Sequence, residues 1–202
     1  MDYEKDVILS MEVLKTTDLQ IGYQSNHSTK IIASDINISL HSGKLISLIG
    51  SNGIGKSTFL KTISGIIPAL DGSIFLNHQK LSNYSATELA EMLSLVLTEK
   101  LPTSSLTVYE LIALGRQPYT NWLGQLSNED EIKIDNAMRL TQINDLRNRK
   151  YYELSDGQFQ KVMIARAIAQ DTPFIILDEP STHLDLFHKV SLFKLLQKLA
   201  HE

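Results

Sequence analysis

Apolar and polar residues in the first third of the chain alternate in one stretch and run together in another. Residues 35–40 alternate polar and apolar, which predicts a half-buried strand. After a turn at residues 42–44, the apolar run 45–49 predicts a strand buried on both faces, as in a parallel sheet. A helix is expected over residues 56–67, and Pro68 would end it.

The pattern becomes mainly helical in the middle of the chain. A turn at Asp71-Gly72 leads into a short strand over residues 73–77. From residue 85 to about residue 146, apolar residues recur at helical spacing, with prolines as breaks. This stretch is expected to form a helical subdomain inserted in an α/β core.

The last third returns to an alternation of helix and strand. A helix is predicted over residues 157–170, and the apolar run 174–177 predicts a buried strand. The final helix is expected over residues 186–199, with one apolar face made of Val190, Phe193, Leu196 and Leu199.

Composition narrows the class of protein. The 202 residues are 43% apolar and 21% charged, which fits one globular domain or a core with a subdomain. The formal charge of −4 disfavours a nucleic-acid partner. The chain has no cysteine, so disulfides and thiolate metal sites are excluded. We expect no secretory signal and no spanning helix, so work at a membrane would need a recruiting partner.

Residues 50–57, Gly-Ser-Asn-Gly-Ile-Gly-Lys-Ser, match the phosphate-binding loop pattern between a predicted strand and a predicted helix. Its glycines allow backbone N–H groups to turn inward toward phosphate oxygens. Lys56 would place its charge on the β- and γ-phosphates of ATP, and the Ser57 hydroxyl would ligate Mg²⁺. The loop therefore predicts a nucleotide site.

Two adjacent carboxylates, Asp178 and Glu179, follow the predicted strand 174–177. The carboxyl edge of such a sheet is where α/β folds bind ligands. Successive side chains of a strand point to opposite sides, so the two acids should have different roles. Asp178 suits the Mg²⁺ shell, and Glu179 is the candidate catalytic residue that polarises the attacking water.

Residues 154–158, Leu-Ser-Asp-Gly-Gln, and the following residues 159–167 resemble the signature motif of ABC-type ATPases. The segment 180–185 looks like the D-loop of that family, and Tyr23 lies where the family places an aromatic ring that stacks on adenine. The motifs occur in the family's order from about residue 14 onward.

The resemblance implies a P-loop NTPase (RecA-like) α/β core with an N-terminal antiparallel β subdomain. In this division, residues 1–84 and 153–202 form the core and residues 85–152 the inserted helical subdomain. Two such domains would meet head to tail, with each ATP between one phosphate loop and the other domain's signature. The expected nucleotide-binding residues are Tyr23, Gly50, Ser51, Asn52, Gly53, Gly55, Lys56, Ser57, Thr58, Ser155, Gly157 and Gln158.

In this arrangement Ser155 and Gly157 would reach the γ-phosphate of the partner's ATP, at a helix N-terminus suited to anions. Ser155 also has a simpler interpretation as an ordinary helix N-cap. Hydrolysis would be an in-line phosphoryl transfer, with Lys56 and Glu179 as the catalytic residues.

Two positions depart from the family pattern. Thr98 stands where the family has its Q-loop glutamine, and threonine cannot offer an amide oxygen to Mg²⁺. The family's switch histidine would follow a further strand, whereas His201 is expected at the end of the last helix. We therefore expect a chain lacking its last strand or strands, with impaired hydrolysis.

Residues 106–119 and 126–130 are similar to the ATPases of iron-siderophore, haem and cobalamin importers. This similarity implies a transport-coupled ATPase, cytoplasmic and peripheral on the inner face of the membrane. Its partners would be a second copy, polytopic permease subunits and, indirectly, a substrate-binding protein. Residues 116–122 are the candidate surface for the permease. The alternative is a soluble ABC ATPase of translation or DNA maintenance, which the acidic balance and the absence of long heptads disfavour.

Overall fold

The computed structural model describes residues 11–26, 28–97, 104–182 and 184–201. The chain divides into two compact units, Met1–Asn83 with Gln197–Glu202 and Tyr84–Leu196. The second unit thus contains the residues expected to form a helical subdomain and also most of the following core segment. The subdomain limits expected from the sequence remain a prediction.

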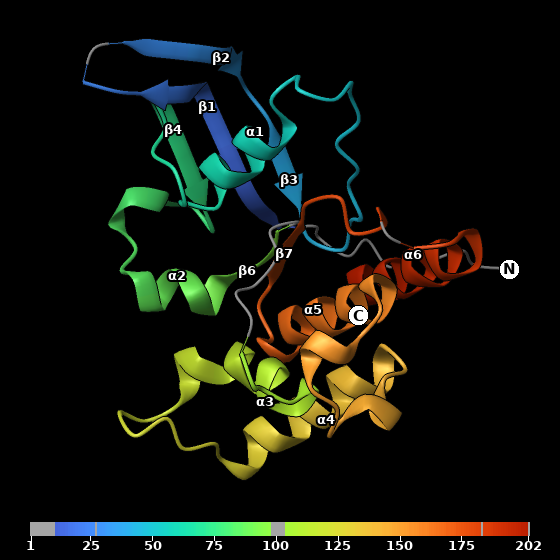
Figure 1. The fold of residues 1–202 in the computed structure, drawn as a ribbon. Helices are drawn as coiled ribbons and strands as arrows, with labels where there is room; N and C mark the ends of the chain where they lie inside the picture. The colour runs from blue at the N-terminus through green and yellow to red at the C-terminus, as the bar shows by residue number, and fades with distance from the viewer. Residues whose placement is uncertain (1–10, 27, 98–103, 183, 202) are drawn as a thin grey trace, which may run out of the picture. The chain divides into compact units, whose positions relative to one another are not determined.

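The first unit is built on an antiparallel sheet (Figure 1). Its strands lie in the order β2-β1-β4-β5, and β3 also pairs with β1. The long strand β1 supplies the buried side chains of Leu14, Leu19 and Ile21, and α1 packs against this strand. The elements of this unit are β1 (Glu12–Gln24), β2 (Thr29–Ile36), β3 (Ser39–His41), α1 (Lys56–Ile63), β4 (Asp71–Leu76), β5 (Gln79–Lys80) and the 3₁₀ helix η1 (Leu81–Asn83).

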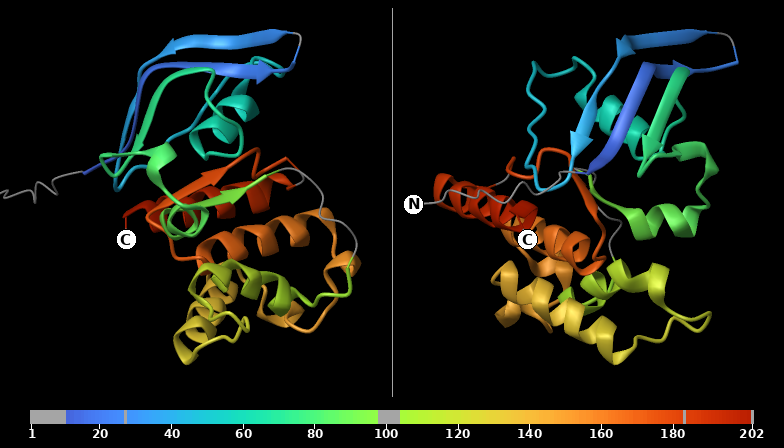
Figure 2. Two further views of the ribbon diagram at one scale, coloured as in Figure 1. Left: turned by 90° about the vertical axis from the view of Figure 1, so that its left-hand side faces the viewer. Right: turned by 180° about the vertical axis from the view of Figure 1, so that it is seen from behind.

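The second unit is mostly helical around a short parallel sheet. Its elements are α2 (Ala86–Met92), β6 (Leu93–Val96), α3 (Val108–Ala113), η2 (Leu114–Tyr119), α4 (Asn128–Leu140), η3 (Asn144–Leu146), η4 (Tyr151–Glu153), α5 (Asp156–Ala169), β7 (Phe174–Leu177) and α6 (Leu186–His201), whose last turn is grouped with the first unit. Strands β6 and β7 pair in parallel. Helices α3 and α4 pack on α5, as Figure 2 shows, and enclose a core that includes Ile112, Ile134, Met138 and Val162.

Two strand predictions in the first unit are wrong in part or in full. Residues 45–49 form no strand, and Ile49 is 90% exposed. An apolar run indicates a tendency to be buried, whereas a strand also needs a neighbour for its N–H and C=O groups, and no described strand pairs with this segment. The expected strand 35–40 is divided between β2, which ends at Ile36, and β3, which begins at Ser39.

Helix limits follow local signals that the apolar pattern did not contain. α1 ends at Ile63, before the predicted limit at Ile67, because Gly65 adopts a φ of 78° and Ile66 donates a hydrogen bond back to Lys61 O. The helix ends in this glycine cap, ahead of Pro68.

The apolar face expected for α6 is correct at Leu196 and wrong at Val190 and Phe193. Leu192 and Leu196 are buried, whereas Val190 and Phe193 are about half exposed. Residues three apart turn by about 300°, so a run of such steps moves steadily around the helix and does not stay on one face. Among the described residues, no helix is long and apolar enough to cross a membrane.

Candidate functional site

The phosphate loop precedes α1 in the first unit. Gly53 and Gly55 have φ angles of 80° and 109°, in the left-handed region that favours glycine. A Cβ atom at Gly55 would lie 2.4 Å from Cγ2 of Ile32, so glycine is required there for steric reasons as well. Lys56 extends back over the loop, and its Nζ donates hydrogen bonds to the carbonyl oxygens of Gly50 and Ser51 at 2.8 and 3.0 Å.

The start of α1 carries the other residues expected at the nucleotide. Ser57 is in its first turn, and Thr58 is buried. The Tyr23 hydroxyl is hydrogen-bonded to Thr58 Oγ1 at 3.0 Å, while half of the tyrosine side chain remains exposed. This bond holds the aromatic ring of Tyr23 beside the helix that follows the loop. The structure thus brings Tyr23 and Thr58 together within one unit.

The two carboxylates after β7 lie in different environments. Asp178 is 4% exposed, and its backbone N–H donates to Val96 O of the neighbouring strand β6. Glu179 is exposed, has a positive φ of 48°, and accepts a hydrogen bond from the Thr182 hydroxyl at 3.0 Å. A positive φ at a glutamate is uncommon and is typical of functional sites. The contrast agrees with separate roles for the two acids.

The signature residues form the start of α5. Ser155 is the N-cap, and its hydroxyl accepts a hydrogen bond from Gln158 N, while the Gln158 side chain accepts one from Ser155 N. The N-cap interpretation of Ser155 is therefore correct. A capping role and a phosphate contact do not exclude each other, because the hydroxyl and the N–H groups of the first turn lie at the positive end of the helix.

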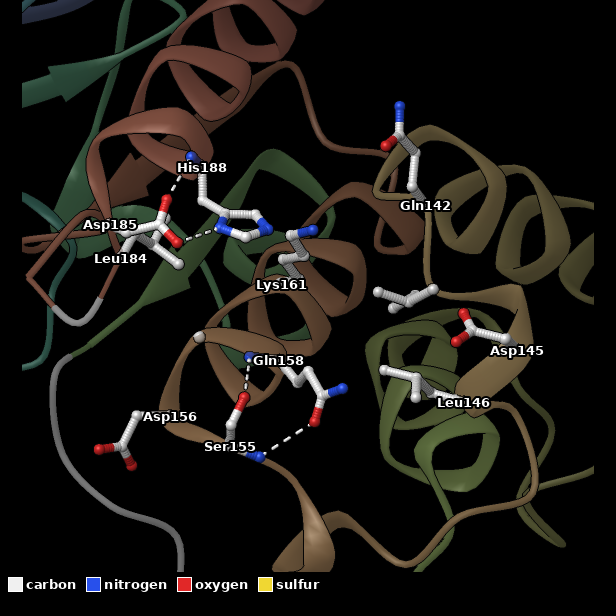
Figure 3. Close-up of a pocket in the computed structure, with 12 residues that line it drawn as sticks. Gln142, Asp145, Leu146, Ser155, Asp156, Gln158, Lys161, Leu184, Asp185 and His188 are labelled. Atoms are coloured by element: carbon white, nitrogen blue, oxygen red, sulfur yellow. Dashed lines mark hydrogen bonds and ion pairs between the residues drawn. The ribbon is translucent and has the colours of Figure 1, made fainter.

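A cavity of about 520 Å³ opens beside these residues (Figure 3). Ser155, Gly157 and Gln158 line it, together with Lys161 from the next turn of α5 and His188 from α6. His188 is oriented by Asp185, whose carboxylate lies 2.8 Å from Nδ1. The hydrogen bonds from the His188 and Phe187 N–H groups and from the imidazole lower the pKa of Asp185.

Some expected residues cannot be placed. Thr98, at the Q-loop position, lies outside the described residues, and so does His183 of the D-loop segment. Among the residues that are described, no group of three or more His, Asp or Glu side chains is arranged to hold a metal ion.

The candidate permease surface at residues 116–122 is only partly a surface. Arg116 is 4% exposed and forms an ion pair with Asp130 at 2.8 Å, so its side chain is a core element. Trp122 is 91% exposed, next to the exposed Leu123. The loop that carries them is ordered by Asn121, whose side chain accepts hydrogen bonds from the N–H groups of Leu123 and Gln125.

Sequence reasoning missed three features of these sites. It gave no role to Lys161 or His188, although both line the cavity beside Ser155, Gly157 and Gln158, hereafter the signature cavity. It treated Arg116 as exposed. The capping box of Ser127 and Asp130 is visible in the sequence and places Asp130 in the first turn of α4, but it does not indicate the pairing of Asp130 with Arg116.

Comparisons with known proteins agree with the motifs. A model of the ABC transporter family matches residues 33–182. The iron(3+)-hydroxamate import ATP-binding protein FhuC of Bacillus subtilis is 39% identical over 95% of this chain and 70% of its own length. An uncharacterized ABC transporter ATP-binding protein of Methanocaldococcus jannaschii is 38% identical over 94% of this chain and 64% of its own length. The chain therefore spans about two thirds of the length of these relatives.

Solved structures show the same fold. The dimeric structure of a bacterial ABC transporter cassette superposes with a TM-score of 0.81 at 25% identity, over 93% of this chain and 82% of that one. The expected α/β fold of the P-loop NTPase class is confirmed by this likeness. Family match, relatives and fold agree, and the chain belongs to the ABC transporter family of ATP-binding proteins.

Proposed function

We propose that this protein binds ATP at residues 50–58 and hydrolyses it to drive transport across a membrane. The observation that carries the proposal is the loop itself, where two glycines in left-handed conformations and Lys56 over the loop carbonyls form a phosphate cradle. Tyr23, tied to Thr58, is the proposed adenine-stacking residue.

Magnesium would be held by oxygen donors. The Ser57 hydroxyl and the Asp178 carboxylate are the proposed ligands, and this donor set is of the kind that Mg²⁺ prefers. Asp178 directly follows β7, at the carboxyl end of the strand, where α/β folds bind ligands. When bound, the ion would neutralise charge on the phosphates. Thr98, at the Q-loop position, is a weaker candidate for a further ligand.

Glu179 is the proposed base that orients the attacking water. Its side chain is exposed and accepts a hydrogen bond from the Thr182 hydroxyl, which orients the carboxylate and leaves it open to water. Ser155, Gly157 and Gln158 would complete the site on a second copy, in keeping with the dimeric cassette among the solved relatives.

The assignment of Lys56 and Glu179 is tested by nucleotide binding and hydrolysis measured on the same variants. Lys56→Ala should lose ATP binding by at least about tenfold, because a charge-assisted phosphate contact is removed. Glu179→Gln should bind ATP with wild-type affinity and lose at least about a hundredfold in turnover. Normal hydrolysis by Glu179→Gln would contradict the role of this residue as the base.

The proposed cargo is an iron–siderophore complex. Relatives include the achromobactin transport ATP-binding protein CbrD of Dickeya dadantii, 39% identical over 94% of this chain and 69% of its own length, beside the hydroxamate import protein. These names support siderophore import more specifically than haem or cobalamin, and they do not favour the soluble alternative in translation or DNA maintenance. The protein would lie on the inner face of the cell membrane, where permease subunits would hold it.

Trp122 and Leu123 are the proposed contact with the permease, because an ordered loop that exposes a tryptophan is typical of an interface. In cells lacking the native gene, the Trp122→Ala variant should restore uptake of a labelled ferric siderophore at least about fivefold less well than wild type, as expected for an interface anchor. Its ATP binding should be unchanged. Uptake equal to wild type would refute the docking role.

A further inference from the structure

The side chain of Arg116 is buried and contacts three parts of the second unit. Its Nε donates to Asp130 Oδ1 at 2.8 Å, and its Nη1 donates to the carbonyl oxygens of Ala169 and Gln170 at 2.9 and 3.2 Å. The guanidinium carbon also lies 4.0 Å from the ring centroid of Tyr119. The side chain therefore connects α4, the end of α5 and the residues that lead into the Trp122 loop.

The C-terminal end of α5 is fixed from two sides. The last carbonyl groups of a helix have no partner within the helix, and a cation placed there also meets the negative end of the dipole. Arg116 fills this role on one side. On the other side, the Gln170 amide donates to Ala90 O at 2.6 Å and Leu93 O at 3.0 Å, which are at the end of α2 and the start of β6.

The backbone beside Arg116 touches α5 directly. A Cβ atom at Gly115 would lie 2.4 Å from Arg166 O, so only glycine permits this approach. Burial lowers the pKa of the Arg166 guanidinium. The segment Gly115-Arg116 is thus held against the last turns of α5 by backbone packing and by hydrogen bonds together.

α5 carries this constraint to the signature. It begins at Asp156, directly after the N-cap Ser155, contains 14 residues, and buries Val162, Ala165 and Ala169 along its length. A helix packed along one side moves as a body, so fixing one end restricts the other. A buried ion pair often adds little net stability, which leaves geometry as its main contribution.

We propose that Arg116 is a positioning residue that ties the Trp122 loop to α5 and so sets the placement of Ser155 and Gly157. A partner that docks on the loop would act on the signature through Tyr119, Arg116 and α5. The inference rests on the proposed function for the meaning of the signature, but the mechanical link within the second unit stands on the contacts alone.

Hydrogen exchange on the purified full chain tests this link. In Arg116→Lys, which keeps the charge and loses the planar fork of donors, the amides of Gln158 and Phe159 should exchange at least about fivefold faster than in wild type. The matched control is Arg147→Lys. Arg147 also pairs with a carboxylate and stacks on a ring, but its partners are Asp135 of α4 and Tyr109 of α3, at 4.0 Å from the ring centroid. The control should change these two amides by less than about twofold.

Asp130→Asn is the second variant, because it keeps the shape of the side chain and should give a smaller change of the same sign. Faster exchange confined to residues 166–170, or equal effects of Arg116→Lys and Arg147→Lys, would overturn the proposal. At saturating ATP, Arg116→Lys should also lower kcat about tenfold without changing nucleotide affinity, since misplacement of a contact affects the rate. If the wild-type chain does not bind ATP, that result would count against the proposed function. It would not affect the hydrogen-exchange result.

Discussion

Glu179 shows how a single residue combines chemistry with backbone strain. Its backbone φ of 48° is one that residues other than glycine rarely adopt. The hydrogen bond from the Thr182 hydroxyl helps to hold its carboxylate in place. Asp178, one position earlier, is buried at the strand end. The alternation of strand side chains was enough to predict separate environments for these acids. It contained no information on φ, which depends on the turn that follows the strand.

The strain at Glu179 predicts an inverted order of stability for two variants. Glu179→Gly should be more stable than Glu179→Ala by about 1 kcal/mol, because glycine alone adopts a positive φ without steric cost. At an ordinary position the order is the opposite. Urea denaturation of both variants measures the difference in the free energy of unfolding. Greater stability of the alanine variant would show that the left-handed conformation is not retained in solution.

Other residues of the site also fall into two groups, those that a local sequence pattern predicts and those that it does not. The roles proposed for Lys56 and Ser57 follow from a local pattern, because a phosphate loop is built from consecutive residues. The Arg116–Asp130 pair and the place of His188 in the signature cavity depend on contacts between segments far apart in the chain. Hydrophobic periodicity does not report such contacts.

At the scale of elements, the local sequence indicates where helices begin, but it does not indicate which strands pair. Four helices begin with a reciprocal capping box, at Ser85, Thr107, Ser127 and Ser155. In each, the residue three positions later is Glu, Asp or Gln, a signal visible in the sequence. The segment 45–49 failed as a strand because strand formation depends on neighbours, which the local sequence does not specify.

The Asp130 cap predicts a pH dependence of stability. Burial raises the pKa of Asp130, but hydrogen bonds from Ser127 and Arg116 outweigh it and leave the pKa below its ordinary value. A lowered folded-state pKa gives stability that is present above the unfolded value, about 3.9, and is lost as the pH falls through the folded value. The stability difference between wild type and Asp130→Asn should therefore be constant above about pH 5 and shrink below about pH 4.

Chemical denaturation across this pH range measures that difference. Asp135→Asn is the control, since Asp135 forms an exposed ion pair with Arg147 and such pairs contribute little. A stability difference for Asp130→Asn that grows as the pH falls would contradict a lowered pKa of Asp130 in the folded protein.

At the scale of the whole molecule, the order of motifs along the chain was sufficient for the family. The phosphate loop, signature and acid pair occur in the sequence order of ABC ATPases, and the family match and dimeric cassette agree with it. Sequence patterns could not give the division into two compact units, because it depends on how contacts are distributed after folding. Completion of an ATP site by the signature of a second copy is the central proposal, in keeping with the dimeric cassette among the solved structures.

The most direct test is the molar mass of the Glu179→Gln variant, measured by light scattering with Mg²⁺ and ATP and again with ADP. A variant that binds ATP without hydrolysing it should accumulate with nucleotide held between two chains. We predict twice the mass of one chain with ATP and the mass of one chain with ADP. Binding of ATP with the mass of one chain in both conditions would contradict a shared site.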